Sequence, residues 1–189
     1  MLRRTSALTA SLLVLTAISS CAVGGGGEQT PPQASPSTEN VDPALAVKNP
    51  KNLKSVTDAC QLLTPEQRTA LQVEGAPTQR QSEFNEPACE FSSSAFDTSL
   101  DVNTNAGGMT AAHERRDNFD NFEATEVAGY PAVKVNFSEN LCNLAVGVSD
   151  TQSLHVYYLV ISGGTPEMED ACGYASKIAA EAVKNIPAA

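Results

Sequence analysis

The chain has 189 residues, 22 of them acidic and 12 basic, and its formal net charge is −10. An acidic surface is repelled by the phosphates of nucleic acids and by anionic lipid headgroups. We therefore expect no nucleic-acid partner and no electrostatic attachment to a membrane. The length suits one domain of ordinary size, preceded by segments of a different composition.

An export signal occupies the start of the chain. Two arginines supply its positive end, and the apolar residues 7–18 are too few to span a bilayer as a permanent helix. The run closes with Ile18-Ser19-Ser20-Cys21, four residues that resemble the lipobox of bacterial lipoproteins. The sequence thus predicts a lipoprotein signal peptide over residues 1–20. Cys21 is the predicted lipid-attachment residue, carrying acyl groups such as palmitate on the extracytoplasmic face of the cell membrane.

Ordinary secretory cleavage is the alternative, because Ala17-Ile18-Ser19 also has the small-x-small form. It would give a secreted protein with Cys21 as a free thiol in an oxidising compartment. The chain has five cysteines, and assigning one of them to lipid leaves an even set for disulfides. The cysteine count therefore favours lipid attachment.

Residues 21–51 form a predicted lipid-anchored tether. They begin with four consecutive glycines after Val23 and continue as a run rich in Pro and Ser without hydrophobic periodicity. About thirty such residues have a root-mean-square reach of roughly 30 Å. We expect this disordered tether to hold a single folded domain, residues 52–189, clear of the lipid headgroups.

The pattern of residues 52–189 predicts an α+β fold, an antiparallel sheet packed against helices. Thr64-Pro65-Glu66-Gln67 has the form of a capping box with proline in the first turn. Alternation around Leu100 and Val102 is typical of a strand with one solvated face. In chain order, we expect helices over 64–71, over 109–119 and from 165 onward, and strands over 100–104, 133–137, 144–148 and 154–161. The last helix repeats small apolar residues and should lie on the sheet.

Four cysteines remain for disulfides: Cys60, Cys89, Cys142 and Cys172. Their wide spacing lacks the paired C-x-x-C pattern of a zinc site or a redox motif, so structural bridges are favoured in an exported protein. Three pairings are possible, and the sequence alone excludes none of them. We favour bridges of Cys60 with Cys89 and of Cys142 with Cys172, because each then closes a loop within one half of the chain.

An ordered set of motifs runs from about residue 50 to the end of the chain: Ala59-Cys60-Gln61-Leu62-Leu63-Thr64-Pro65-Glu66, Cys89-Glu90-Phe91, Gly129-Tyr130-Pro131-Ala132-Val133, Cys142 and Ala171-Cys172. This set resembles a family of actinobacterial lipoproteins whose shared region is called domain of unknown function 3558. One departure is Phe91, where members often have Trp. The resemblance implies the fold and the envelope location, and the family carries no agreed activity. Its architecture is loosely similar to PsbP-like and Mog1-like proteins.

The sequence points to no catalytic residue, cofactor or metal site. His113 and His155 are the two histidines, and neither lies in a metal-binding or nucleophile motif. We expect His113 to be a solvated helix residue and His155 to lie on a face of the sheet.

We expect the protein to be a non-enzymatic binding or accessory module. Its predicted partners are the membrane, through the N-terminal lipid anchor, and either an envelope protein or a small apolar ligand. An envelope enzyme with a site assembled only in the fold, and a structural subunit of a membrane-associated assembly, are the alternatives.

Overall fold

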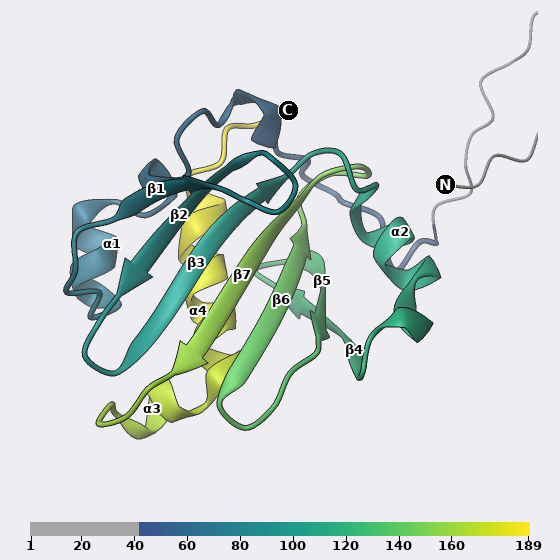
Figure 1. Cartoon of the computed structure of the whole chain (residues 1–189). Helices are drawn as coiled ribbons and strands as arrows, with labels where there is room; N and C mark the ends of the chain where they lie inside the picture. The colour runs from purple at the N-terminus through teal and green to yellow at the C-terminus, as the bar shows by residue number, and fades with distance from the viewer. Residues whose placement is uncertain (1–41) are drawn as a thin grey trace, which may run out of the picture. The chain divides into compact units, whose positions relative to one another are not determined.

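A seven-stranded, fully antiparallel sheet forms the centre of the domain (Figure 1). The computed structural model describes residues 42–189. The strand order is β1-β2-β3-β7-β6-β5-β4, so β1 and β4 are the edges. The strands are β1 (Thr78–Gln81), β2 (Pro87–Ser92), β3 (Phe96–Asn103), β4 (Phe122–Val127), β5 (Tyr130–Val135), β6 (Leu141–Gly147) and β7 (Ser153–Val160). The α+β antiparallel prediction is confirmed.

The longest helix covers one face of this sheet. In Figure 1, α4 runs behind the strands, and its buried side chains include Tyr174, Ile178 and Val183. The helical elements are η1 (Leu53–Ser55), η2 (Ala59–Leu62), α1 (Pro65–Ala70), α2 (Gly108–Glu114), η3 (Arg116–Asn118), α3 (Pro166–Glu169) and α4 (Ala171–Lys184). Within residues 42–189, no helix has the length and apolar character needed to cross a membrane.

Side chains along each strand alternate between the main core and the other face of the sheet. Leu100 and Val102 on β3, and Leu154, Val156 and Tyr158 on β7, are almost fully buried in the main core. Successive side chains of a strand point to opposite faces, so the residues between them lie on the face away from α4. We call this second face the open face.

The predicted capping box is present at the start of α1. The Thr64 hydroxyl accepts a hydrogen bond from the Gln67 backbone N–H, and the Gln67 side chain accepts one from the Thr64 N–H at 2.9 Å. The same Gln67 side chain accepts a hydrogen bond from Asn185 Nδ2 at 2.6 Å. A residue that caps α1 therefore also attaches it to the end of α4.

The predicted final helix is interrupted. Two helices, α3 and α4, meet at Asp170, whose side chain accepts a hydrogen bond from Gly173 N at 3.0 Å and so caps α4. A Cβ atom at Gly173 would lie 2.2 Å from Asp170 Oδ2. The capping carboxylate needs the space that glycine leaves, and this explains the new helix start.

Two other predicted boundaries were wrong for local reasons. The strand expected from residue 133 begins at Tyr130, because Ala128 and Gly129 take positive φ angles of 51° and 84° and complete the turn before it. The helix expected over 109–119 ends at Glu114 and continues as the short η3. The sequence also missed three strands, β1, β2 and β4.

Both disulfides join the neighbouring cysteines, as predicted. Cys60–Cys89 joins η2 to β2, and Cys142–Cys172 joins β6 to α4. Cys89 and Cys142 are fully buried on the core face of the sheet. Each bridge therefore fixes a helical segment to a strand that faces it.

Residues 42–51, assigned to the tether from the sequence, pack on the domain. Leu45 contacts the small apolar cluster formed by Met109, Val133 and Ala145. Tyr130 Oη donates a hydrogen bond to Asn49 O at 2.9 Å, and Lys51 pairs with Ala188 in a β-bridge. The folded unit thus begins before residue 52. Cys21 and the rest of the tether lie outside the described residues.

The two bridges should stabilise the domain by similar amounts. Their sequence separations are 29 and 30 residues, and loop-closure entropy at this length is worth about 3.5 kcal/mol. We expect the double variants Cys60→Ala/Cys89→Ala and Cys142→Ala/Cys172→Ala each to lose about this much free energy of unfolding in urea titrations. Unchanged midpoints in either double variant would contradict the prediction.

Candidate functional site

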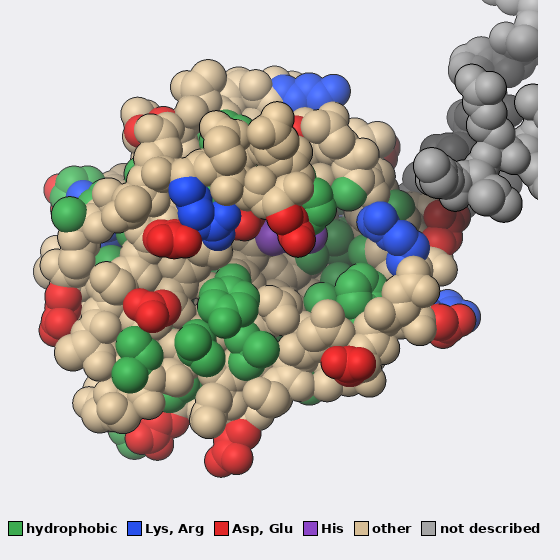
Figure 2. Space-filling model, viewed as in Figure 1, with side chains coloured by type: hydrophobic (Ala, Val, Ile, Leu, Met, Phe, Trp, Pro, Cys, Tyr) green, Lys and Arg blue, Asp and Glu red, His purple; other side chains and the backbone are tan. Residues whose placement is uncertain are grey.

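The open face carries a groove of about 960 Å³. Figure 2 shows it as a hollow with acidic, basic and hydrophobic side chains around it and a histidine recessed within. Its lining comes from strands β1, β2, β3, β5, β6 and β7, from α2 and η3, and from the β1–β2 turn. The volume lies at the upper end of the range for small-molecule sites.

The register of β3 and β7 sets the floor of the groove. Asp101 pairs with His155 and Ser99 pairs with Tyr157, so these four residues share the open face. Tyr157 is the most exposed described aromatic side chain of the sheet, at 39 %. On its other side the register partner is Asn143 of β6, so small polar residues flank the ring.

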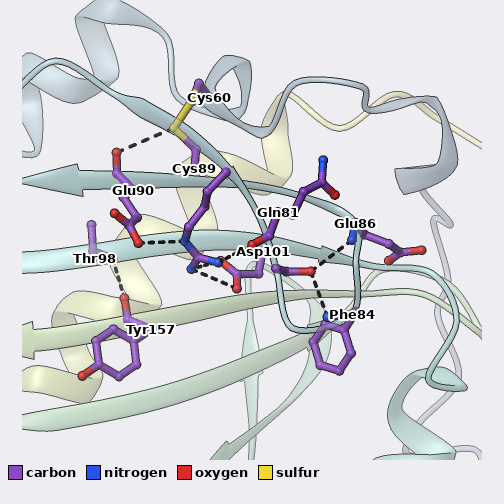
Figure 3. A network of polar contacts seen from close by, with 11 residues as sticks. Cys60, Gln81, Phe84, Glu86, Cys89, Glu90, Thr98, Asp101 and Tyr157 are labelled. Carbon is purple, nitrogen blue, oxygen red and sulfur yellow. Dashed lines mark hydrogen bonds and ion pairs between the residues drawn. A yellow bond between two sulfur atoms is a disulfide. The ribbon is translucent and has the colours of Figure 1, made fainter.

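Arg80, Glu90 and Asp101 form an ionic network beside this floor. Arg80 of β1 places Nε 2.8 Å from Glu90 Oε1, and its Nη2 donates to both carboxylate oxygens of Asp101 at 3.0 and 3.1 Å. Figure 3 shows Glu90 and Asp101 converging from neighbouring strands on the face that carries the Tyr157 ring. The Nε contact is an ion pair whose N–H is not aligned for a hydrogen bond. Because Glu90 is well exposed, the network contributes more to side-chain orientation than to stability.

His155 is held by two neighbours at one ring nitrogen. Its Nε2 lies 3.0 Å from Ser153 Oγ and 3.2 Å from Asn103 Nδ2. Asn103 Oδ1 already accepts hydrogen bonds from the backbone N–H groups of Asn105 and Ala106, which fixes the amide so that Nδ2 donates to His155. Nε2 is thus the acceptor, and the proton of the neutral ring lies on Nδ1.

Burial, together with the nearby Arg115 guanidinium, lowers the pKa of His155 from 6.5 to about 4. The imidazole is therefore neutral at neutral pH. The side chain is mostly enclosed yet reaches the groove, and the Phe84 ring packs edge-on against it at a centroid distance of 5.2 Å. His155 lies on a sheet face, as the sequence predicted.

The β1–β2 turn places Phe84 over His155. Ser82 Oγ accepts hydrogen bonds from the backbone N–H groups of Phe84 and Glu86 within this turn. The Glu86 carboxylate then accepts hydrogen bonds from Thr104 N and Asn105 Nδ2, both at 2.6 Å. The turn is consequently fastened to the loop that follows β3.

Helix α2 forms the other side of the groove. It lies over β5 and β6, where Met109 packs on Val133 and Ala145. A Cβ atom at Gly147 would lie 2.4 Å from Met109 Cγ, so the helix can approach β6 only because that residue is glycine. Arg115, at the end of α2, donates to the backbone oxygens of Ala111 and Ala106 and is directed along the groove wall.

Of the two histidines considered from the sequence, only His155 lines the groove. His113 is half-buried against Phe122, with ring centroids 5.0 Å apart, so its predicted solvated position was wrong. The four cysteines lie in the disulfides, away from the groove. No cluster of three metal-ligating side chains occurs in the part of the chain that the structure describes.

Sequence reasoning missed Arg80, Glu90 and Tyr157. The predicted strand over 100–104 contains Asp101, but only the pairing of β3 with β2 and β7, and of β2 with β1, brings Arg80, Glu90 and Tyr157 to the same face. The polar segment Thr78–Gln81 has no apolar alternation, however, and was not recognised as a strand.

Acidification should destabilise the domain through His155. Its pKa is about 4 in the folded state and 6.5 unfolded, so the unfolded chain binds the extra proton between these values. Stability due to the neutral ring is present above pH 6.5 and is lost as pH falls towards 4, by up to about 3 kcal/mol. We expect His155→Gln to remove this part of the pH dependence in urea titrations.

His113→Gln is the matched control for that measurement. The pKa of His113 is also lowered by burial, so its loss changes the same window, but by a smaller amount. Equal pH profiles for the wild-type chain and His155→Gln would contradict the prediction.

Comparison with known proteins places the chain in a family but gives no activity. No curated protein and no solved structure matches it, so the looser likeness to PsbP-like and Mog1-like proteins stays a prediction. A family described as proteins of unknown function, DUF3558, matches residues 16–185. This match covers most of the chain, which therefore belongs to the DUF3558 family of proteins of unknown function.

Proposed function

We propose that this protein is a lipid-anchored envelope protein whose folded domain binds a small ligand in the groove of the open face, without chemical change to the ligand. The observation that carries the proposal is the groove itself. Its polar side chains are held in place before any ligand arrives, by the contacts of Arg80 with Asp101 and of Asn103 with His155. Pre-organised polar groups in a concave site are typical of ligand-binding sites.

The cysteine pairing supports the anchor. All four cysteines among residues 42–189 lie in disulfides, so Cys21 is the one left over. A sulfur after an apolar run and two small residues is the acceptor that lipid attachment requires. The proposed location is the outer face of the cytoplasmic membrane.

The contacts of His155 favour binding over catalysis. A general base needs a free lone pair and a pKa near the working pH. Here the Nε2 lone pair is shared by Asn103 and Ser153, and the pKa of about 4 makes the ring a weak base. Ser153 is only 3 % exposed, which leaves little room for a substrate at its hydroxyl.

A structural subunit of an assembly has less support. Tyr157 and Ile161 are the two large hydrophobic side chains exposed on the described domain, whereas stable interfaces have an apolar centre built from many. The lining of the groove is also mixed, so the ligand we propose has polar as well as apolar surface.

The anchor is tested by Cys21→Ser. Stable membrane attachment needs more than one acyl chain, and the variant loses the acceptor for them. We expect it to leave the membrane fraction or to accumulate as the precursor, while intact mass of the wild-type protein shows added acyl groups. An unmodified Cys21 in the wild-type protein would contradict the anchor.

The groove is tested by native mass spectrometry of the protein taken from its own membranes. We expect a non-covalent ligand on the wild-type chain, and its loss in Tyr157→Ala because the exposed ring forms the middle of the groove floor. Ile161→Ala is the matched control, since Ile161 is 51 % exposed but does not line the groove. Equal ligand occupancy in the two variants would contradict binding at this site.

A further inference from the structure

We propose that the ligand of the groove is a neutral carbohydrate, bound with a sugar ring against Tyr157. This inference rests on the proposed binding function and names its ligand class. Three properties of the open face lead to it: an exposed aromatic ring, fixed side chains with paired donors and acceptors, and carboxylates that are paired with a guanidinium group.

Tyr157 supplies the apolar contact. The ring lies on the central strand β7 between the short side chains of Ser99 and Asn143, so nothing large shields it on either side. Its hydroxyl makes no hydrogen bond to any residue between 42 and 189. An aromatic ring with one apolar face and a free polar tip suits a sugar, which has C–H groups on one face and hydroxyls around its edge.

The ionic network supplies the polar contacts. Arg80 fixes Asp101 through two hydrogen bonds and draws in Glu90 from the next strand. Each carboxylate oxygen keeps a further lone pair, so the pair can accept hydrogen bonds from neighbouring hydroxyls of one sugar ring. The Nδ1–H of His155 adds a donor on the same floor, since Nε2 is the acceptor in its hydrogen bonds.

The charges of the groove disfavour a strongly charged ligand. The lining has four carboxylates, Glu83, Glu90, Asp97 and Asp101, and two guanidinium groups, Arg80 and Arg115, so its net negative charge repels an anion. The two carboxylates nearest Arg80, Glu90 and Asp101, are already paired with it, so a cation there would compete with that guanidinium. A neutral ligand meets neither the repulsion nor the competition. An acyl chain is also a poor fit, because these carboxylates would lose water without gaining partners.

The ligand class is tested by surface plasmon resonance. The experiment uses the full-length protein, purified from its native cells and held in lipid nanodiscs. The probes are neutral hexasaccharides of glucose, mannose and galactose, with hexalysine, hexaglutamate and lysophosphatidylcholine for comparison. We expect at least one hexasaccharide to bind, with affinity changing less than twofold between 50 and 500 mM salt because no net charge is involved.

The variants assign the binding to the groove. Tyr157→Ala should weaken hexasaccharide binding at least tenfold, and Tyr157→Phe should keep it within about threefold because the ring is retained. Glu90→Gln should weaken it severalfold through loss of a charged acceptor, whereas Ile161→Ala should not change it.

Other outcomes overturn the inference in distinguishable ways. If no hexasaccharide binds at millimolar concentration while a charged probe or the lipid binds in a Tyr157-dependent manner, the carbohydrate class is wrong and the binding function stands. If no probe binds and native mass spectrometry finds no ligand dependent on Tyr157, both proposals fall.

Discussion

The one-sided covering of the sheet by α4 is the constraint on which the rest of the structure depends. The buried side chains of this helix pack against β6 and β7, and the Cys142–Cys172 bridge joins it covalently to the sheet. The second bridge does the same for η2 and β2. With one face sealed in this way, the part of the other face that α2 leaves uncovered needs no apolar packing, and its side chains are free to be polar.

The open face shows what that freedom produces. Acidic, basic and aromatic residues that would be costly in a core lie side by side on β1, β2, β3 and β7, and some of them, such as Arg80 and Asp101, are joined across strands. Stability and the proposed ligand contacts therefore come from opposite faces of the same strands. On β7, for example, Tyr158 is buried and donates to Met168 O, while the preceding Tyr157 stands in the groove.

Sequence patterns made much of the fold predictable, but they did not predict the groove. The capping box at Thr64, the alternation around Leu100 and the neighbouring disulfides all express short-range rules, and each was confirmed. The edge strands β1 and β4 were missed because edge strands are polar, which hides the hydrophobic pattern. The groove joins residues far apart in the chain, such as Arg80 with Asp101 and Asn103 with His155. Only the strand register, which no local pattern encodes, brings them together.

The loop from Thr104 to Gly107 connects the two sides of the groove. Glu86 holds the β1–β2 turn to its first two residues, and Arg115 of α2 donates to Ala106 O. The β1–β2 turn and α2 are thus both hydrogen-bonded to this short loop, which sets the distance between them. Lengthening or shortening that stretch would resize the site while leaving every strand pairing intact. Under the proposed binding function, differences in ligand size among family members should appear as changes in the length of this segment before they appear in the sheet.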